Sequence, residues 1–491
     1  MTIASRLRGA ALLASLLAPL PAVAQAPAAP SEEGARAIAQ AVRDWLARQT
    51  DNAFDGTGLG LKVLAEGDTY RLELPFGGSY FNDTVTLGDG ALVATVKPLD
   101  GGRWQVVNAT LPSKMRAEIP SGPKGTPSAM SIAIENQQTA GTYDPSLASP
   151  STFTTTLTGY TTTTETATGT QTSRIGKLVG RSEWSPTGPG RVTIQGDSTM
   201  ENYSTVTPLP GGDTAKVSIA RLAGATRIEN FDMDGLGQLL RTAFEIGMSA
   251  KSEADAGRKG MRPQDKALAT KLVGQVFTMM DALETDYTYE NIRLEGGPLF
   301  SGSLRRFGLG LTAGAPDGKM DIKLRLALEG LESPLLKGGP WLEFIPHRIA
   351  LTPRMGGMPK NEVMALLRRA IDTEGNDIDA DAMALLAANP VEVGIDDLVL
   401  DVGPLRLKGE GALAVASKDE ATGEAELRAT GLDALIRRAN QVPDLKMAAP
   451  VLIFLKGIGK QEGTETVWHI TVADRKVMVN DTDLSDLMPS K

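Results

Sequence analysis

Residues 319–330 read KMDIKLRLALEG, and apolar and charged side chains alternate along this stretch. The apolar positions are Met320, Ile322, Leu324, Leu326 and Leu328. A period of two places these residues on one face of a β-strand and the charged residues on the other. The stretch therefore predicts an amphipathic strand of an antiparallel sheet, and the apolar face of such a sheet needs a cover.

Similar strands are predicted further along the chain. In residues 404–415, the apolar face consists of Leu405, Leu407, Leu413 and Val415. Gly409 and Gly411 lie in the same row, which predicts a bend or the close approach of another backbone. Residues 391–403 alternate as far as Ile395 and resume at Leu398, as they would around a β-bulge.

The N-terminal half adds short alternating runs between residues 60 and 120, separated by Gly-Asp turns that are typical of an antiparallel meander. Helices are predicted at residues 31–50, 233–248, 263–283, 360–370 and 431–441. In the first of them, Ser31 is the expected N-cap, and one apolar stripe contains Ile38, Val42, Trp45 and Leu46. The fold class is thus α+β and β-rich, with long twisted antiparallel sheets and several amphipathic helices packed on one face.

Residues 152–172, TFTTTLTGYTTTTETATGTQT, are rich in threonine and contain no proline. An O-glycosylated stalk normally has proline between its threonines. Threonine is β-branched and favours strands, so we interpret the tract as two polar strands at a solvated edge, with turns near Gly159 or Gly169. A disordered linker is the alternative.

Residues 1–24 are typical of a cleavable signal peptide: Arg6 and Arg8 precede an apolar run that ends in Ala22-Val23-Ala24. We expect export to the periplasm, with no membrane span in the mature chain. The halves are assigned to residues 25–260, with the leading helix and the threonine-rich strands, and 261–491. The net charge of −9 makes nucleic acid an unsuitable partner, and the absence of cysteine excludes disulfides and thiolate ligands.

Few residues suggest catalysis. The two histidines, His347 and His469, lie in predicted strands and lack a metal-binding spacing. No nucleophile motif or phosphate-binding loop is complete. The acidic run 372–381 departs from the spacing of a calcium loop, and an interhelical loop with capping carboxylates explains it better, although calcium stays an open question. We expect no enzyme activity, no metal and no cofactor.

The C-terminal pattern resembles a known family. It consists of residues 404–415 (PLRLKGEGALAV), 422–439 (TGEAELRATGLDALIRRA), 451–460 (VLIFLKGIGK) and 467–481 (VWHITVADRKVMVND). This pattern resembles an uncharacterised family of exported Gram-negative proteins, a domain of unknown function. It is also similar, more distantly, to the AsmA-like long-sheet envelope proteins, which are implicated in lipid traffic. The resemblance implies a large β-rich envelope protein and assigns no catalytic residue, and the missing retained anchor argues against a membrane-bridging role.

The strands offer more apolar surface than the predicted helices can cover. We therefore expect a non-enzymatic envelope protein with an apolar groove for a lipid or acyl chain. The predicted groove wall contains Leu324, Leu326, Leu405, Leu407 and Leu413. A closed core is the more common place for such leucines. The alternatives are a structural or protein-interaction module with an envelope protein partner, bound by strand addition at a polar edge such as the threonine tract, and a hydrolase with a carboxylate-only site.

Overall fold

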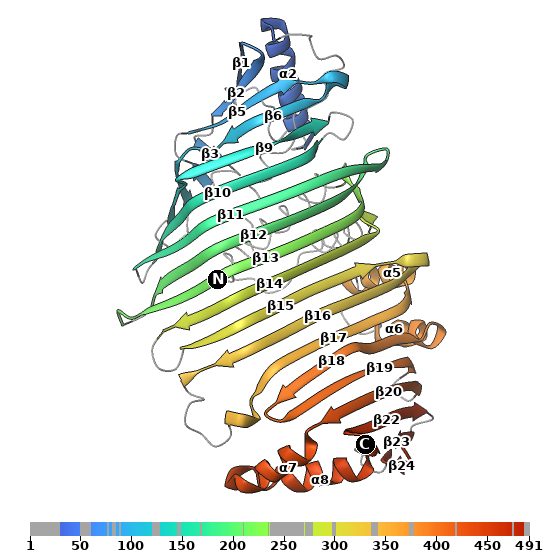
Figure 1. The fold of residues 1–491 in the computed structure, drawn as a ribbon. Helices are drawn as coiled ribbons and strands as arrows, with labels where there is room; N and C mark the ends of the chain where they lie inside the picture. Colours follow the sequence, from blue (N-terminus) through green and yellow to red (C-terminus); the bar gives the residue numbers. More distant parts are fainter. Residues whose placement is uncertain are drawn as a thin grey trace. The chain divides into compact units, whose positions relative to one another are not determined.

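The computed structural model is β-rich, with long antiparallel strands and a few helices (Figure 1). It describes residues 30–49, 60–75, 78–80, 85–87, 90–119, 128–144, 149–166, 169–209, 211–233, 235, 270, 278–296, 301–334, 342–372, 378–417, 420–473 and 476–485. The predicted signal peptide and the predicted helix at 233–248 lie outside these residues, apart from Met233 and Gly235. So does the predicted boundary at residue 260. The predicted β-rich, antiparallel fold class is confirmed.

The chain divides into two compact units. The N-terminal unit contains Met1–Lys216, Ala223–Leu268 and Thr278–Met280, and the C-terminal unit contains Val217–Leu222, Ala269–Phe277 and Asp281–Lys491. Strand β13 (Thr214–Asp232) therefore contributes residues to both units.

The N-terminal unit is a meander of antiparallel strands. Its strands are β1 (Lys62–Glu66), β2 (Thr69–Pro75), β3 (Gly78–Tyr80), β4 (Val85–Leu87), β5 (Ala91–Pro98), β6 (Trp104–Thr110), β7 (Lys114–Ile119), β8 (Ser128–Ala133), β9 (Asn136–Asp144), β10 (Ser149–Thr166), β11 (Gly169–Gly188) and β12 (Arg191–Pro208). Hydrogen bonds connect β1, β2, β5, β6, β9, β10, β11 and β12 in that order. A second run, β3–β4–β7–β8, joins β10 next to β9.

Helix α2 (Glu32–Gln49) covers the first strands of this unit. Ser31 caps it as predicted, because its Oγ accepts a hydrogen bond from the Gly34 N–H at 3.0 Å. The buried residues that it shares with the strands are Ala35, Ile38, Ala39, Val42, Leu61, Tyr70, Leu72, Ala94, Val96, Trp104, Ala109 and Tyr143. The side chains of Trp45 and Leu46 lie outside the described residues. A helix thus closes the apolar face of these strands.

The threonine tract forms strands, but not at an edge. Residues 149–166 make one strand, β10, which continues through Gly159, and β11 begins at Gly169. One side of β10 pairs with β11, and the other side pairs with β9 and β8. The predicted solvated edge is therefore wrong, because neighbouring strands take up both rows of backbone groups. Strand addition at this tract, on which the protein-interaction alternative relied, loses its open edge.

The C-terminal unit is a second run of antiparallel strands. They are β14 (Ala282–Glu295), β15 (Gly302–Gly314), β16 (Lys319–Glu332), β17 (Pro346–Pro359), β18 (Val391–Val402), β19 (Leu405–Ser417), β20 (Glu420–Thr430), β21 (Lys460–Glu462), β22 (Glu465–Ala473), β23 (Lys476–Val479) and β24 (Thr482–Asp483). Strands β14 to β20 pair in sequence order, and β20 then pairs with β22. The predicted bulge in β18 is confirmed by a register shift between Ile395 and Leu398.

The α-helices described in this unit are α5 (Lys360–Asp372), α6 (Ile378–Ala388), α7 (Leu432–Gln441) and α8 (Ala448–Ile458). The predicted helices at 360–370 and 431–441 are thereby confirmed. The helix predicted at 263–283 ends too late, because strand β14 begins at Ala282 and Leu283 pairs with Ala313. The preference of the alternating residues Leu283, Thr285 and Tyr287 for a strand face explains this difference.

Candidate functional site

The candidate site is the apolar face of the C-terminal unit. Residues that pair directly across neighbouring strands point to the same face, so the register defines apolar rows that cross the sheet. One row contains Tyr287, Leu309, Leu326, Leu351, Leu398, Gly409, Leu427 and Trp468. Another contains Leu283, Ala313, Ile322, Met355, Val393, Leu413, Gly423 and Val472. Across eight strands spaced about 4.8 Å apart, such a row is about 34 Å long.

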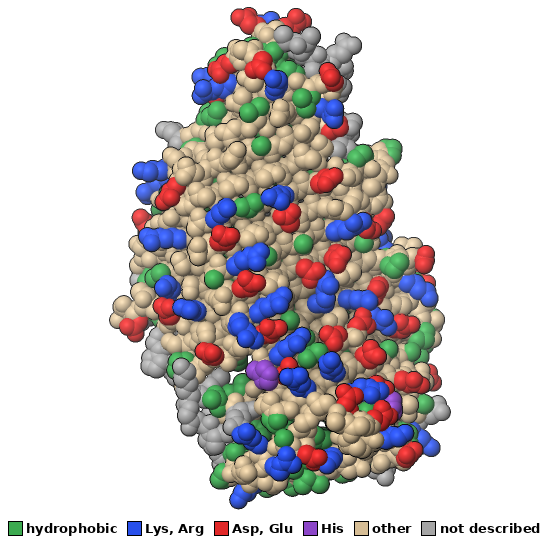
Figure 2. All heavy atoms as spheres, in the orientation of Figure 1, with side chains coloured by type: hydrophobic (Ala, Val, Ile, Leu, Met, Phe, Trp, Pro, Cys, Tyr) green, Lys and Arg blue, Asp and Glu red, His purple; other side chains and the backbone are tan. Residues whose placement is uncertain are grey.

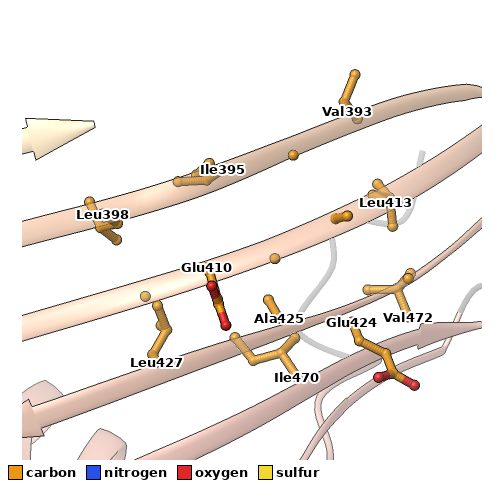
Figure 3. A pocket seen from close by; sticks show the side chains of 15 residues that line it. Val393, Ile395, Leu398, Glu410, Leu413, Glu424, Ala425, Leu427, Ile470 and Val472 are labelled. Carbon is orange, nitrogen blue, oxygen red and sulfur yellow. The ribbon is translucent and has the colours of Figure 1, made fainter. Parts of the chain in front are cut away.

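A hollow of about 390 Å³ lies in this face where β18, β19, β20 and β22 meet (Figure 3). Its side chains are Val393, Ile395, Leu398, Leu413, Ala425, Leu427, Ile470 and Val472. Gly409, Gly411 and Gly423 also line it. Glu410 and Glu424 border the hollow, but they alternate with these residues along β19 and β20, so they belong to the opposite face by strand alternation. We call this hollow the apolar trough.

Glycine makes the trough possible. A Cβ atom at Gly411 would lie 2.9 Å from the Glu424 carbonyl oxygen and would collide with Ala425. A Cβ at Gly409 would collide with the side chain of Leu427 and lie 3.1 Å from the Glu426 carbonyl oxygen. The predicted close approach of another backbone to these glycines is therefore confirmed, and larger residues would displace β20 from β19.

Helices α7 and α8 cover one end of the same face. Their cluster with the strands contains the buried residues Ala429, Leu432, Trp468 and Val479, against which Leu405, Leu407, Leu427, Ile436, Leu452, Ile458, Ile470 and Leu484 pack. Leu427 and Ile470 belong both to this cluster and to the trough. The trough thus begins where the helical cover ends.

Two residues of the trough show how open it is. Val393 and Ile395 are each 37% exposed, although both lie in the middle of the sheet face. Valine and isoleucine at such positions are normally buried. More than a third of each of these two side chains is therefore open to water.

The opposite face of these strands is charged, and Figure 2 shows Lys, Arg, Asp and Glu side chains interspersed over it. Lys323 pairs with Asp396 at 2.9 Å, and Arg354 also approaches Asp396, at 3.6 Å. On β20, the guanidinium of Arg428 forms a hydrogen bond with Glu426 and holds the pKa of that carboxyl below its usual value. The same contact raises the pKa of Arg428. One face of these strands is thus charged and the other apolar.

Comparison with known proteins bears on the same strands. Residues 230–486, more than half of the chain, match the family described as "Uncharacterized protein conserved in bacteria (DUF2125)". The chain belongs to this family. The match includes β14 to β24, and therefore the whole apolar trough. No curated protein and no solved structure matches the chain.

The predicted groove leucines fall into three places. Leu413 lines the trough, whereas Leu405 and Leu407 lie under the cover of α7 and α8. Leu324 and Leu326 lie on β16, outside the hollow; both are half-buried, and the register places Leu326 in an apolar row of the same face. The trough residues of β20 and β22 were missed, because they reach the trough only through the pairing of β20 with β19 and of β22 with β20.

The residues considered for catalysis or metal binding lie elsewhere. His469 is on the charged face, where its Nδ1 lies 3.1 Å from a carboxylate oxygen of Glu426. His347 is exposed on β17. In the acidic run, residues 373–377 lie outside the described residues, and Asp381 pairs with Arg369 at 2.5 Å. In the described part of the chain, no group of three or more His, Cys, Asp or Glu side chains is placed to hold a metal ion.

Membrane spans were also considered. Among the helices in the described ranges, none combines the length and the apolar character needed to cross a bilayer.

Proposed function

We propose that this protein is a non-enzymatic, exported protein of the Gram-negative cell envelope, and that its C-terminal unit holds the acyl chains of a lipid on its apolar face. The trough is the proposed binding site, and the rows of leucines that extend from it across β14 to β18 are its continuation. The distant similarity to AsmA-like proteins and the periplasmic location are part of this proposal.

The main support for this proposal is the exposure of Val393 and Ile395. A contiguous apolar surface in an otherwise charged sheet marks a place where another molecule binds. The side chains that line the trough are hydrocarbon, so the matching ligand is hydrocarbon too. A volume of about 390 Å³ is within the range of small-molecule sites, which is about 300–1,000 Å³.

The dimensions of the face suit acyl chains. The hydrocarbon core of a bilayer is about 30 Å thick, so one acyl chain extends about 15 Å. The apolar rows are about 34 Å long, since they cross eight strands. A chain lying along a row would exchange water for apolar side chains along its whole length, at about 0.8 kcal/mol for each buried methylene.

Lipid retention tests the proposal. The mature protein is purified from bacterial cells without detergent, and bound lipid is extracted and quantified by mass spectrometry. We expect lipid in stoichiometric amounts. Leu413→Asp should remove it, because the carboxylate would lie inside the trough.

Thr422→Asp is the matched control. Thr422 is exposed on the charged face of β20, where it pairs with Ala414. The Thr422→Asp substitution introduces the same charge into the same unit, and this variant should keep its lipid. The proposal is wrong if the folded wild-type protein carries no lipid, or if both variants retain it equally.

A further inference from the structure

Helix α8 presents apolar side chains to the outside of the C-terminal unit. Met447, just before the helix, is 86% exposed. Within the helix, the exposed fractions are 58% for Val451, 53% for Ile453, 47% for Phe454 and 40% for Leu455. Four large apolar residues within five positions form an exposed patch. Single exposed apolar residues, by contrast, are common on protein surfaces.

The inner side of the same helix is firmly attached. Ala449 is buried, and Leu452 and Ile458 pack against the cluster of Trp468 and Val479. The indole N–H of Trp468 donates a hydrogen bond to the Leu455 carbonyl oxygen at 2.7 Å. The Asn480 side-chain amide donates one to the Ile458 carbonyl oxygen at 2.8 Å. The orientation of α8 is therefore fixed, and its apolar outer side is part of the fold.

The length of α8 decides between spanning and surface binding. Its 11 residues extend about 16 Å, which is about half of a hydrocarbon core. A short helix with an exposed apolar side suits the membrane interface, where such a side enters the boundary between headgroups and acyl chains by about 5–10 Å.

The charge around α8 is opposite to that of the whole chain. Between Leu432 and Lys460 the sequence contains five Lys or Arg residues, two aspartates and no glutamate, whereas the chain as a whole carries −9. Lys446 and Lys460, on either side of α8, are both exposed. Figure 2 shows hydrophobic and basic side chains side by side over α7 and α8. Cations beside an apolar helix fit anionic phospholipids.

A protein partner fits this surface less well. The core of a protein–protein interface is depleted in lysine relative to the remaining surface. Here, Lys446 directly precedes the exposed Met447, and Lys456 lies within α8, where it pairs with Asp433 at 2.5 Å. Such lysines can extend to the headgroups while the apolar residues insert.

From these observations we infer that α8 docks the C-terminal unit onto an anionic phospholipid bilayer. Val451, Ile453, Phe454 and Leu455 enter the interface, and Lys446 and Lys460 contact the headgroups. The cluster under α8 shares Leu427 and Ile470 with the trough, so a docked helix brings one end of the trough towards the lipid. The docking itself does not depend on lipid binding in the trough.

Vesicle co-sedimentation of the full mature protein tests the inference. The probes are vesicles of phosphatidylcholine alone and vesicles that also contain about 30% phosphatidylglycerol, a content that gives the surface a negative potential. We expect binding to the anionic vesicles that weakens as sodium chloride is raised. The double substitution Ile453→Ser and Phe454→Ser should reduce the partition constant by about tenfold or more, because two large apolar side chains no longer insert.

The control replaces two equally exposed apolar residues elsewhere in the unit, Leu294→Ser and Leu331→Ser, and should bind like the wild-type protein. Lys446→Gln with Lys460→Gln leaves the apolar side intact and should weaken binding to anionic vesicles only. Absence of wild-type binding to anionic vesicles would overturn the inference. Equal losses of vesicle binding in the two serine double variants would overturn it as well. Self-association in lipid-free solution that the α8 serine variant abolishes would also overturn it, since α8 would then bind a second copy.

Discussion

The apolar strand faces of the two units are covered by helices to different extents. In the N-terminal unit, α2 lies over the first strands, and Tyr70, Val96 and Trp104 are at most 1% exposed. In the C-terminal unit, α7 and α8 cover only one end of the face, and Val393 and Ile395 remain 37% exposed. Both faces come from the same alternation of apolar and polar residues. Alternation creates an apolar face, and the position of the helices decides whether it becomes a core or an exposed surface.

The contrast also exists within one strand. On β19, Leu407 packs under the helical cover, and Leu413, six residues later on the same face, lines the trough. Both leucines are half-buried, and they differ in the elements packed over them. The pair therefore compares the helical cover with the trough without changing strand or face.

The largest expected effect is on the closed core of the N-terminal unit. Trp104→Ala removes a side chain that is 1% exposed and leaves a cavity beside Tyr70, whose ring centroid lies 5.8 Å from that of Trp104. We expect the free energy of unfolding of this unit to fall by about 3–5 kcal/mol. Urea denaturation followed by far-UV circular dichroism measures the change. A loss below about 1 kcal/mol would mean that this face is not a closed core.

The next largest expected effect is a difference in stability between substitutions of the two leucines of β19, Leu407 and Leu413. Leu407→Asp should destabilise the C-terminal unit by several kcal/mol, about 3 or more, because a carboxylate would be buried under α7 and α8 without a partner. Leu413→Asp should cost about 1 kcal/mol or less, since the trough is open to water. Urea denaturation of both variants gives the comparison. Equal losses of unfolding free energy in the two variants would indicate that the trough is closed in solution.

Filling the trough should affect binding more than stability. The Ala425 side chain lies in the trough between Leu413 and Ile470 (Figure 3), so Ala425→Leu occupies space that a ligand would take. We expect the amount of co-purified lipid to fall severalfold, with the unfolding free energy within about 1 kcal/mol of the wild-type value. Ala414→Leu, on the opposite face of β19 and outside the lining of the trough, is the control and should retain its lipid. Unchanged retention in Ala425→Leu would place the lipid elsewhere.

The smallest effect concerns the charged face. The pKa of Glu426 is lowered, first of all by its hydrogen bond with Arg428, so its contribution to stability is present above the ordinary value of 4.5 and disappears as the pH falls through the lowered pKa. Glu426→Gln should lower the thermal midpoint slightly at pH 7, and the difference should be smaller at pH 3, because the contribution is lost as Glu426 becomes protonated. Scanning calorimetry at both pH values tests this. A difference that persists or grows at the lower pH would contradict the assignment.

Much of the fold could be predicted from local patterns. Alternation predicted β16, β18 and β19, and the break between Ile395 and Leu398 predicted the bulge, because both depend on residues close in sequence. The threonine tract was placed at an edge because its side chains are polar. Its burial depends instead on hydrogen bonds of its backbone with β8, β9 and β11, which side-chain chemistry does not reveal.

The trough itself could be predicted only in part. The glycines of β19 indicated a close approach, and Leu413 was included in the predicted groove wall. Which leucines lie under a helix depends on where α7 and α8 pack, 25 or more residues from Leu405 along the chain. The exposed apolar side chains of α8 could not be predicted, because exposure is set by the elements that pack around the helix.

Site-specific photocrosslinking in cells shows whether the open apolar face holds lipid. A photoreactive phenylalanine analogue replaces Ile395 in the trough, or Thr422 on the charged face as the control, and cells that produce the protein are irradiated. We expect lipid adducts at position 395 and none at position 422, as measured by mass spectrometry of the purified protein. Adducts only with protein at position 395, or equal lipid adducts at both positions, would contradict this expectation.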